Sequence, residues 1–271
     1  MKIRLFFIMA LLYLMSEQAF ALNFMGPPTA ELNQGQWAVG YNYAYSVQDL
    51  NKTGQDWSII IDDIVTSTGE GQLRIEDLTV QRHYIGVNCG LIDSWEIYAR
   101  IGFSDVEGDI NWLGEGIKTG YDFSNDFAWG WGTKITLKRS DTVAWGASLH
   151  MDWLDTSTSK TKNIPGSGLR KDTVSIDTYD TLLAVWPTID MSGWKLYGGL
   201  FYYSLDGDYC FERNSFELDT IEREDANIKE GSDLGAFIGA VLDVADNSDL
   251  TAELSFTSDG WALGAGIAQK F

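Results

Sequence analysis

The sequence predicts an all-β protein, a transmembrane antiparallel β-barrel of about ten strands, between eight and twelve. Three observations predict this fold. Apolar residues alternate with polar or small residues along many segments, aromatic residues gather at the ends of those segments, and long connections alternate with short ones. With 45% hydrophobic and 13% aromatic residues, the chain is too apolar to be disordered, and charges interrupt it too often for a helical membrane span.

The chain is strongly acidic, with 39 Asp and Glu residues against 19 Lys and Arg residues and a formal net charge of −20. Nucleic-acid phosphates must be neutralised by Lys and Arg, so this charge argues against nucleic acid as a partner. Cys89 and Cys210 are the only cysteines, too few for a disulfide framework or a four-cysteine zinc site. We expect no cofactor and no metal.

The first 21 residues have the pattern of a secretory signal peptide. Lys2 and Arg4 precede an apolar run over 5–15, and Ala19-Phe20-Ala21 fits the small-residue cleavage motif. The run is shorter than the roughly 20 residues that a membrane helix needs. We expect export and cleavage after Ala21, followed by a periplasmic extension over 22–34 and a barrel domain over 35–271.

Ten alternating segments are the predicted strands. Two of them, 78–91 and 176–187, are less clear than the rest. The first is irregular, because Gln81 and His83 fall on its otherwise apolar side, which indicates a bulge or an early exit from the apolar zone. The connections over 48–77, 104–125, 155–174 and 204–232 are long, and we expect them to be acidic external loops. The predicted strands cover 37–45, 78–91, 95–103, 127–137, 143–153, 176–187, 194–203, 234–244, 250–256 and 261–271.

The ends of the strands indicate that the apolar face points outward, toward lipid. Aliphatic residues such as Val39 and Ile97 lie between aromatic residues, and this spacing is typical of two interfacial belts around a membrane barrel. A soluble core has no reason to segregate aromatic residues in this way. The predicted girdle consists of Trp37, Tyr45, Trp95, Phe103, Trp129, Trp145, Trp153, Trp194, Tyr202 and Trp261.

The opposite face carries glycines and charges, which a barrel interior can pair or hydrate. The predicted charge network could line a narrow ion path or form a salt-bridged plug. Barrels of about eight strands are filled by side chains, and ten strands lie close to that limit, which favours the plug. The network consists of Glu96, Arg100, Lys134, Lys195 and Glu253.

The last strand, over 261–271, alternates up to Phe271 and resembles the C-terminal recognition strand of Gram-negative outer-membrane barrels. The segments Trp95–Gly102 and Trp194–Leu200 are similar to hairpin strands of small OmpA-type outer-membrane β-barrel domains. Gln269 departs from the pattern, since an aromatic or apolar residue is usual there, and the assembly signal is weaker than is typical. The resemblance implies an outer-membrane protein of a Gram-negative-type envelope. Its partners would be outer-membrane lipid and lipopolysaccharide, with the barrel-assembly machinery during biogenesis, and we expect a monomer.

The function that we expect is non-enzymatic: a structural or surface-interaction role, or a narrow low-conductance channel. The alternative is an omptin-like hydrolase at the barrel rim. It would use His150 and Asp152, which share the interior face of one strand, with carboxylates supplied by Asp62 and Asp63. A second alternative, a soluble exported β protein, predicts extraction without detergent.

Overall fold

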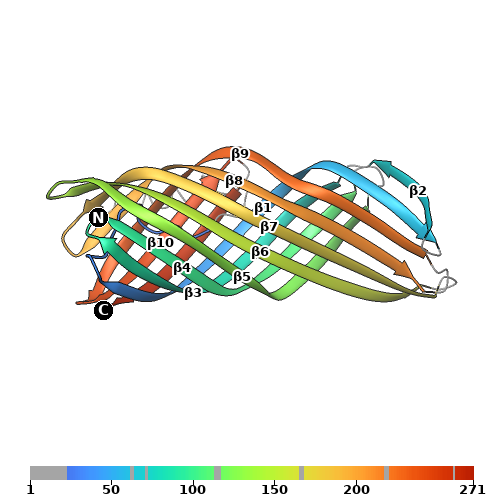
Figure 1. Cartoon of the computed structure of the whole chain (residues 1–271), viewed down its shortest axis with the longest axis horizontal. Helices are drawn as coiled ribbons and strands as arrows, with labels where there is room; N and C mark the ends of the chain where they lie inside the picture. Colours follow the sequence, from blue (N-terminus) through green and yellow to red (C-terminus); the bar gives the residue numbers. More distant parts are fainter. Residues whose placement is uncertain are drawn as a thin grey trace, which may run out of the picture.

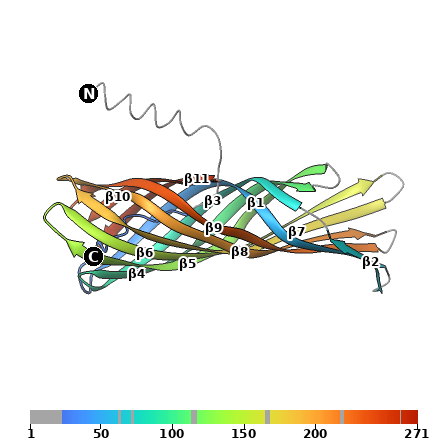
Figure 2. The same ribbon diagram turned by 90° about the horizontal axis from the view of Figure 1, so that it is seen from above.

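In the computed structural model of the chain, the alternating segments form long antiparallel strands that close into a barrel (Figures 1 and 2). The structure describes residues 23–61, 64–70, 73–112, 117–164, 168–216, 220–258 and 260–271. The strands are β1 (Trp37–Ile61), β2 (Ile64–Glu70), β3 (Leu73–Ile92), β4 (Trp95–Trp112), β5 (Ile117–Arg139), β6 (Val143–Ile164), β7 (Gly168–Asp190), β8 (Trp194–Ser215), β9 (Thr220–Ala245), β10 (Ser248–Thr257) and β11 (Gly260–Lys270).

The barrel closes because β1 pairs with β3 on one side and with β11 on the other, from Ala38↔Lys270 to Gln48↔Gly260. Strand β2 pairs only with the far end of β1, as a hairpin, and is not part of the ten-stranded wall formed by β1 and β3–β11. This closed antiparallel barrel confirms the predicted fold class and strand number. Among the described residues, no helix is long and apolar enough to cross a membrane.

The C-terminus and the short turns between β3 and β4, β5 and β6, β7 and β8, and β9 and β10 lie at one end, here called the inner end (Figure 1). The β1–β2 hairpin lies at the opposite, outer end. Strands β10 and β11 stop about halfway along the barrel. Beyond them β1 pairs directly with β9, from Lys52↔Ile228 to Ile61↔Thr220. Among the described residues, β5 and β6 pair no further out than Ala128↔Leu154, and β1 and β3 no further out than Asn51↔Arg74.

The four connections expected as long loops are mostly strand, which corrects that prediction. For example, β6 and β7 stay paired in unbroken register from Val143↔Ile189 to Ile164↔Gly168. Their outer parts were missed because the polarity reverses there. In the outer half many interior positions are apolar and many exterior positions are polar, as in a soluble barrel. The buried apolar side chains of this outer core include Leu78, Val80, Val106, Phe123, Leu154, Val174, Ile176, Tyr209 and Phe211.

The irregular strand contains no bulge at the doubtful positions. The register of β1 and β3 is continuous from Gln48↔Leu78 to Trp37↔Cys89, so Gln81 and His83 face outward. The His83 ring stacks on Phe103 at 4.9 Å, and the Tyr41 hydroxyl lies 2.6 Å from its Nδ1. Of the two readings, the early exit from the apolar zone is correct. His83 is part of the outer aromatic belt.

Candidate functional site

The N-terminal segment, residues 23–34, enters the barrel from the inner end instead of forming the periplasmic extension that the sequence led us to expect. Asn23, Met25, Ala30 and Leu32 are all buried. Gly26-Pro27-Pro28 and the polar residues around it have the composition of a linker. The segment can lie inside because charged groups of the barrel wall satisfy its main-chain polar groups.

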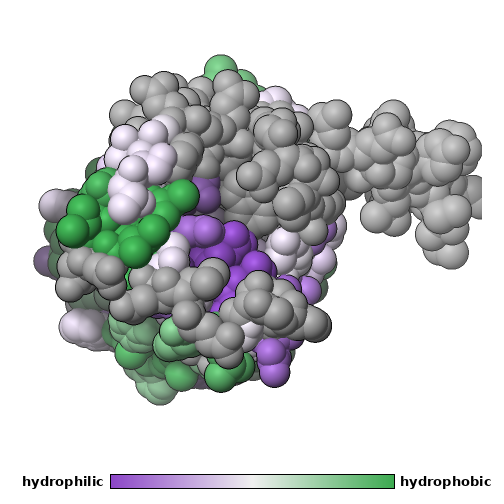
Figure 3. Space-filling model, turned by 90° about the vertical axis from the view of Figure 1, so that its right-hand side faces the viewer, coloured by the Kyte–Doolittle hydropathy of each residue, from purple (hydrophilic) through white to green (hydrophobic). Residues whose placement is uncertain are grey.

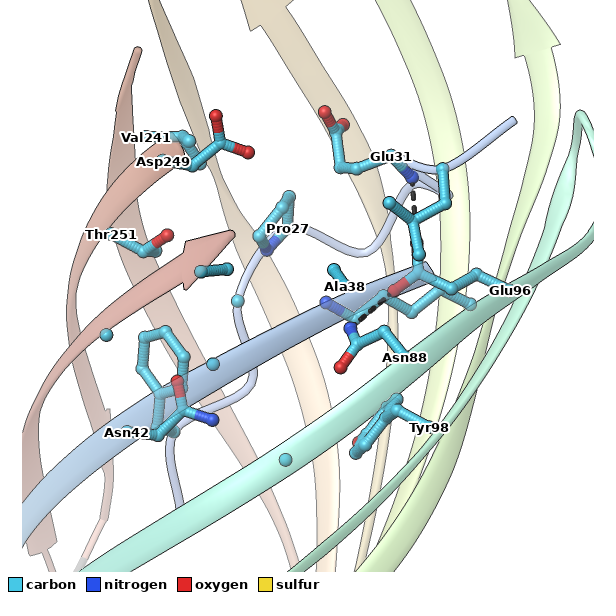
Figure 4. Close-up of a pocket in the computed structure, with 18 of the residues that line it drawn as sticks. Pro27, Glu31, Ala38, Asn42, Asn88, Glu96, Tyr98, Val241, Asp249 and Thr251 are labelled. Atoms are coloured by element: carbon cyan, nitrogen blue, oxygen red, sulfur yellow. Dashed lines mark hydrogen bonds between the residues drawn. The ribbon is translucent and has the colours of Figure 1, made fainter. Parts of the chain in front are cut away.

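Glu96 of β4 holds the lower part of the segment (Figure 4). Its carboxylate accepts hydrogen bonds from the Glu31 main-chain N–H at 3.0 Å and from the Asn88 side-chain amide at 2.7 Å. The Glu31 carboxylate pairs in turn with the Lys195 ammonium. A cavity of about 100 Å³ lies beside these residues, between the N-terminal segment and the wall.

Glu253 of β10 holds the middle of the segment. One carboxylate oxygen accepts the Met25 N–H at 3.0 Å, and the other accepts the Gly26 N–H at 2.9 Å and the Tyr197 hydroxyl at 3.0 Å. Lys134 is also buried and lies against Gly26, and its ammonium is 5.8 Å from the centre of the Tyr98 ring. All five residues of the predicted charge network therefore lie in the interior or at its inner mouth.

Arg100 of β4 connects the segment to a buried ion pair. Its Nη1 donates to the Phe24 carbonyl at 2.9 Å, and its Nε and Nη2 donate to the Asp152 carboxylate. Between the two strands β5 contributes Gly130, which is in register with both residues. A Cβ at this position would overlap the Asp152 carboxylate.

Asp180 and Arg82, which were not among the predicted network residues, lie at the top of the segment. Asp180 accepts a hydrogen bond from the Asn23 side-chain amide at 2.9 Å and lies 3.6 Å from Arg82. Both residues are buried. The alternation of β7 does put Asp180 on the interior face, so its position could have been read from the sequence. Arg82 was hidden because its neighbours Gln81 and His83 made the face assignment of β3 ambiguous.

The candidate hydrolytic pair is not formed. His150 and Asp152 are 1% and 2% exposed, so both are closed off from a substrate. The Asp152 carboxylate binds Arg100, whereas His150 Nδ1 meets the Tyr98 hydroxyl across Gly132 of β5. Asp62 and Asp63 lie outside the described residues. Within the described part of the chain, no cluster of His, Cys, Asp or Glu could hold a metal ion.

The predicted girdle residues all lie on the exterior face of the inner half, six of them exposed and four half-buried. At the outer belt the Trp129 and Trp153 rings stack at 4.3 Å, and Tyr45 and Trp261 lie 5.5 Å apart. Phe271 is exposed at the inner end, where its main chain exchanges hydrogen bonds with Trp37.

An ion network lies inside the outer half, beyond the belts. Asp172 is buried and accepts hydrogen bonds from Arg170 and Arg213, each at 3.0 Å, and Arg213 also donates to Glu222. Burial lowers the pKa of Arg213, but the hydrogen bonds and charges of the two carboxylates outweigh it and raise that pKa above its usual value. Burial raises the pKa of Tyr121, in the same region, to about 12. Figure 3 views this end and shows hydrophilic side chains gathered at its centre.

No family model matches the sequence, and no curated protein matches it. Solved structures with a similar fold include the outer-membrane protease OmpT of Escherichia coli, at 10% identity and a TM-score of 0.48, covering 93% of this chain and 99% of that one. The outer-membrane protein OprG of Pseudomonas aeruginosa has 9% identity and a TM-score of 0.40, covering 88% and 97%. The toluene transporter TbuX of Ralstonia pickettii has 10% identity and a TM-score of 0.42, covering 94% and 95%. At these values the similarity extends to no more than the general barrel architecture.

Proposed function

We propose that this protein is an integral outer-membrane barrel with a structural or surface-interaction role. The proposal rests on one observation: side chains or main chain fill the interior in both halves of the barrel. The N-terminal segment occupies the inner half, and the outer core, which includes Phe123, Val174 and Phe211, occupies the outer half. A solute channel needs a continuous water-filled path, and this packing opposes one.

The exterior of the inner half supports membrane insertion. Ile85 and Ile101 are each 61% exposed, and Leu200 is 54% exposed. So many aliphatic side chains facing outward between two aromatic belts would be unfavourable in water and suit the hydrocarbon layer of a bilayer. Strands of 18–26 residues, such as β4 and β9, are about twice as long as the 9–11 residues needed to cross a membrane. The outer half would therefore project beyond the membrane, with the outer ends of its strands available for contacts at the cell surface.

Single cysteines test the crossing and its direction. In a Cys89→Ser/Cys210→Ser background, Asn163→Cys places a thiol near the tip of β6, and Asn247→Cys places one in the turn at the inner end. Both asparagines are exposed. A membrane-impermeant maleimide applied to intact cells should label the first variant and leave the second unlabelled until the cells are broken. Equal labelling of both in intact cells, or extraction of the protein without detergent, would contradict the proposal.

Planar bilayers test whether the interior is closed. The refolded full-length protein should insert without producing stable conductance steps, because the segment and the outer core block the same path. Reproducible unitary steps would instead support a narrow channel, the other role that the sequence left open. The refolded sample must first show heat-modifiable migration on gels. An absence of conductance can then be assigned to the folded barrel and not to unfolded protein.

A further inference from the structure

Six hydrogen bonds join side chains of the inner barrel wall to main-chain groups of the N-terminal segment, beside side-chain contacts such as Asn23 with Asp180 and Glu31 with Lys195. Glu253 accepts the N–H groups of Met25 and Gly26, and Arg100 donates to the carbonyl of Phe24. These three main-chain groups are consecutive in the segment, and each meets a charged side chain. Hydrogen bonds to charged groups are stronger than those between neutral groups. Because the peptide groups here belong to the main chain, these bonds do not depend on the peptide's side chains.

The lower part of the segment is also bound through its main chain, by one hydroxyl and two charged side chains. Thr136 accepts the Ala30 N–H at 3.1 Å, and Arg139 donates to the Ala30 carbonyl at 3.0 Å. Glu96 accepts the next N–H group, that of Glu31. Six main-chain groups of the segment are therefore bound by wall side chains that come from β4, β5 and β10.

The shape of the wall also fits a main chain. A Cβ at Gly146 of β6 would lie 2.5 Å from the Pro28 carbonyl oxygen. A Cβ at Gly90 of β3 would overlap the Asn33 carbonyl group. Wall glycines thus leave room for the segment to lie directly against the strands.

We propose that the inner half of the barrel is a binding site for an extended peptide, and that residues 23–34 are its tethered ligand. The site recognises main-chain N–H and C=O groups through Glu253, Glu96, Arg100 and Arg139. It therefore accepts an unlinked peptide of suitable size once the covalent tether is cut. The inference rests on the filled inner half of the proposed function and not on its membrane or surface role.

The test cuts the tether after folding, so that folding itself is not affected. A protease recognition sequence replaces residues around Gln34 and Gly35, which are exposed at the inner mouth. The folded protein is cleaved in detergent and washed, and a fluorescent peptide with the sequence of residues 22–34 is titrated in. Fluorescence anisotropy should rise to saturation, and excess unlabelled peptide should reverse it.

Two altered peptides separate main-chain recognition from side-chain recognition. N-methylation at Met25 and Gly26 removes both donors to Glu253 and should weaken binding at least tenfold. Substitution Met25→Leu keeps both donors and should bind within about threefold of the parent. Equal binding of the N-methylated and parent peptides would overturn the proposal. So would the absence of saturable binding, or a cleaved segment that excess peptide cannot replace. Because this measurement is made in detergent, its failure is distinct from a failure of the labelling or bilayer experiments.

Discussion

Arg100 and Asp152 form a buried ion pair that crosses an intervening strand, with Arg100 Nε donating to Asp152 Oδ1 at 2.8 Å. The two residues belong to β4 and β6, and Gly130 of β5 lies in register between them. The pair is possible only because Gly130 has no side chain. The same strand repeats the arrangement two residues later, where Gly132 separates Tyr98 from His150.

Substitution Gly130→Ala should separate this ion pair. The added Cβ overlaps the Asp152 carboxylate, so the pair must part and leave two buried charges without their best partners. We expect the free energy of unfolding to fall by about 2–4 kcal/mol, measured by guanidinium titration of the refolded protein with tryptophan fluorescence. Gly86→Ala is the matched control. It is also an interior glycine at the level of Arg100, but its Cβ would meet no atom closer than 3.6 Å. A control variant as unstable as Gly130→Ala would show that the ion pair is not the cause.

Substitution Gly146→Val should expel the N-terminal segment without unfolding the barrel. The new side chain would occupy the place of the Pro28 main chain. We expect thermolysin to cleave within residues 23–34 at least ten times faster than in the parent protein, with the heat-modifiable migration retained. Mass spectrometry of the products measures the cleavage. Ala147→Val, the next residue on β6 and on its exterior face, should leave the segment protected. Protection of the segment in Gly146→Val would mean that the wall does not bind it closely.

The sequence was sufficient to predict the ten strands of the barrel wall, because alternation in the inner half is strong. In β6, for example, Trp145, Leu149 and Trp153 face outward while Ser148 and Asp152 face inward. The outer halves of the strands were missed for a physical reason. Their apolar residues point inward and their polar residues outward, so the segments look like acidic loops when a lipid-facing exterior is expected.

The interior partners could not be predicted to the same degree. Alternation puts Arg100 and Asp152 on the interior face, but their pairing across β5 depends on the stagger of three strands. Two glycines at alternate positions of the strand between them, Gly130 and Gly132, are the sequence signal that could have suggested such a crossing. Entry of the N-terminal segment was not predictable either, since Gly26-Pro27-Pro28 is also typical of an extended linker.

Substitution Asp177→Asn should stabilise the barrel at neutral pH. Asp155, Asp177 and Asp208 face one another directly on β6, β7 and β8, on the exterior beyond the outer belt. Partial burial, and then the charges of Asp155 and Asp208, raise the pKa of Asp177 above its usual value. The ionised form is therefore less favourable in the folded protein than in the unfolded chain. The parent protein gains stability as the pH falls through the raised pKa.

At pH 7 we expect Asp177→Asn to raise the free energy of unfolding by about 0.2–1 kcal/mol, the range for like charges on facing strands. The difference from the parent protein should shrink as the pH falls through the raised pKa and vanish below about pH 3, where the carboxyl is protonated in both states. Denaturant titrations at several pH values measure it. Asp141→Asn, in the exposed turn between β5 and β6, should show no such pH-dependent gain. A gain from Asp177→Asn that did not change with pH would rule out charge repulsion as its origin.

Substitution Asp172→Ala should loosen the outer half selectively. Asp172 is 4% exposed and binds both Arg170 and Arg213, so its loss leaves Arg213 with Glu222 alone. We expect a local destabilisation of about 1–3 kcal/mol, the range for removing a hydrogen-bonded charged partner from a buried site. Hydrogen exchange followed by mass spectrometry should show faster exchange in the outer parts of β7 and β8 and unchanged exchange in their inner parts.

An exposed ion pair in the same half of the barrel gives the control for Asp172→Ala. Asp225 pairs with Arg223, and their side chains are 52% and 49% exposed. Water screens such a pair, so Asp225→Ala should change stability by less than about 1 kcal/mol and leave local exchange nearly unaltered. If both variants accelerated exchange equally, the buried position of Asp172 would not be what stabilises the outer half. Faster exchange throughout the barrel would show that the two halves unfold together. The contrast between the variants therefore tests whether the apolar outer half is a separate stability unit above the membrane-facing half.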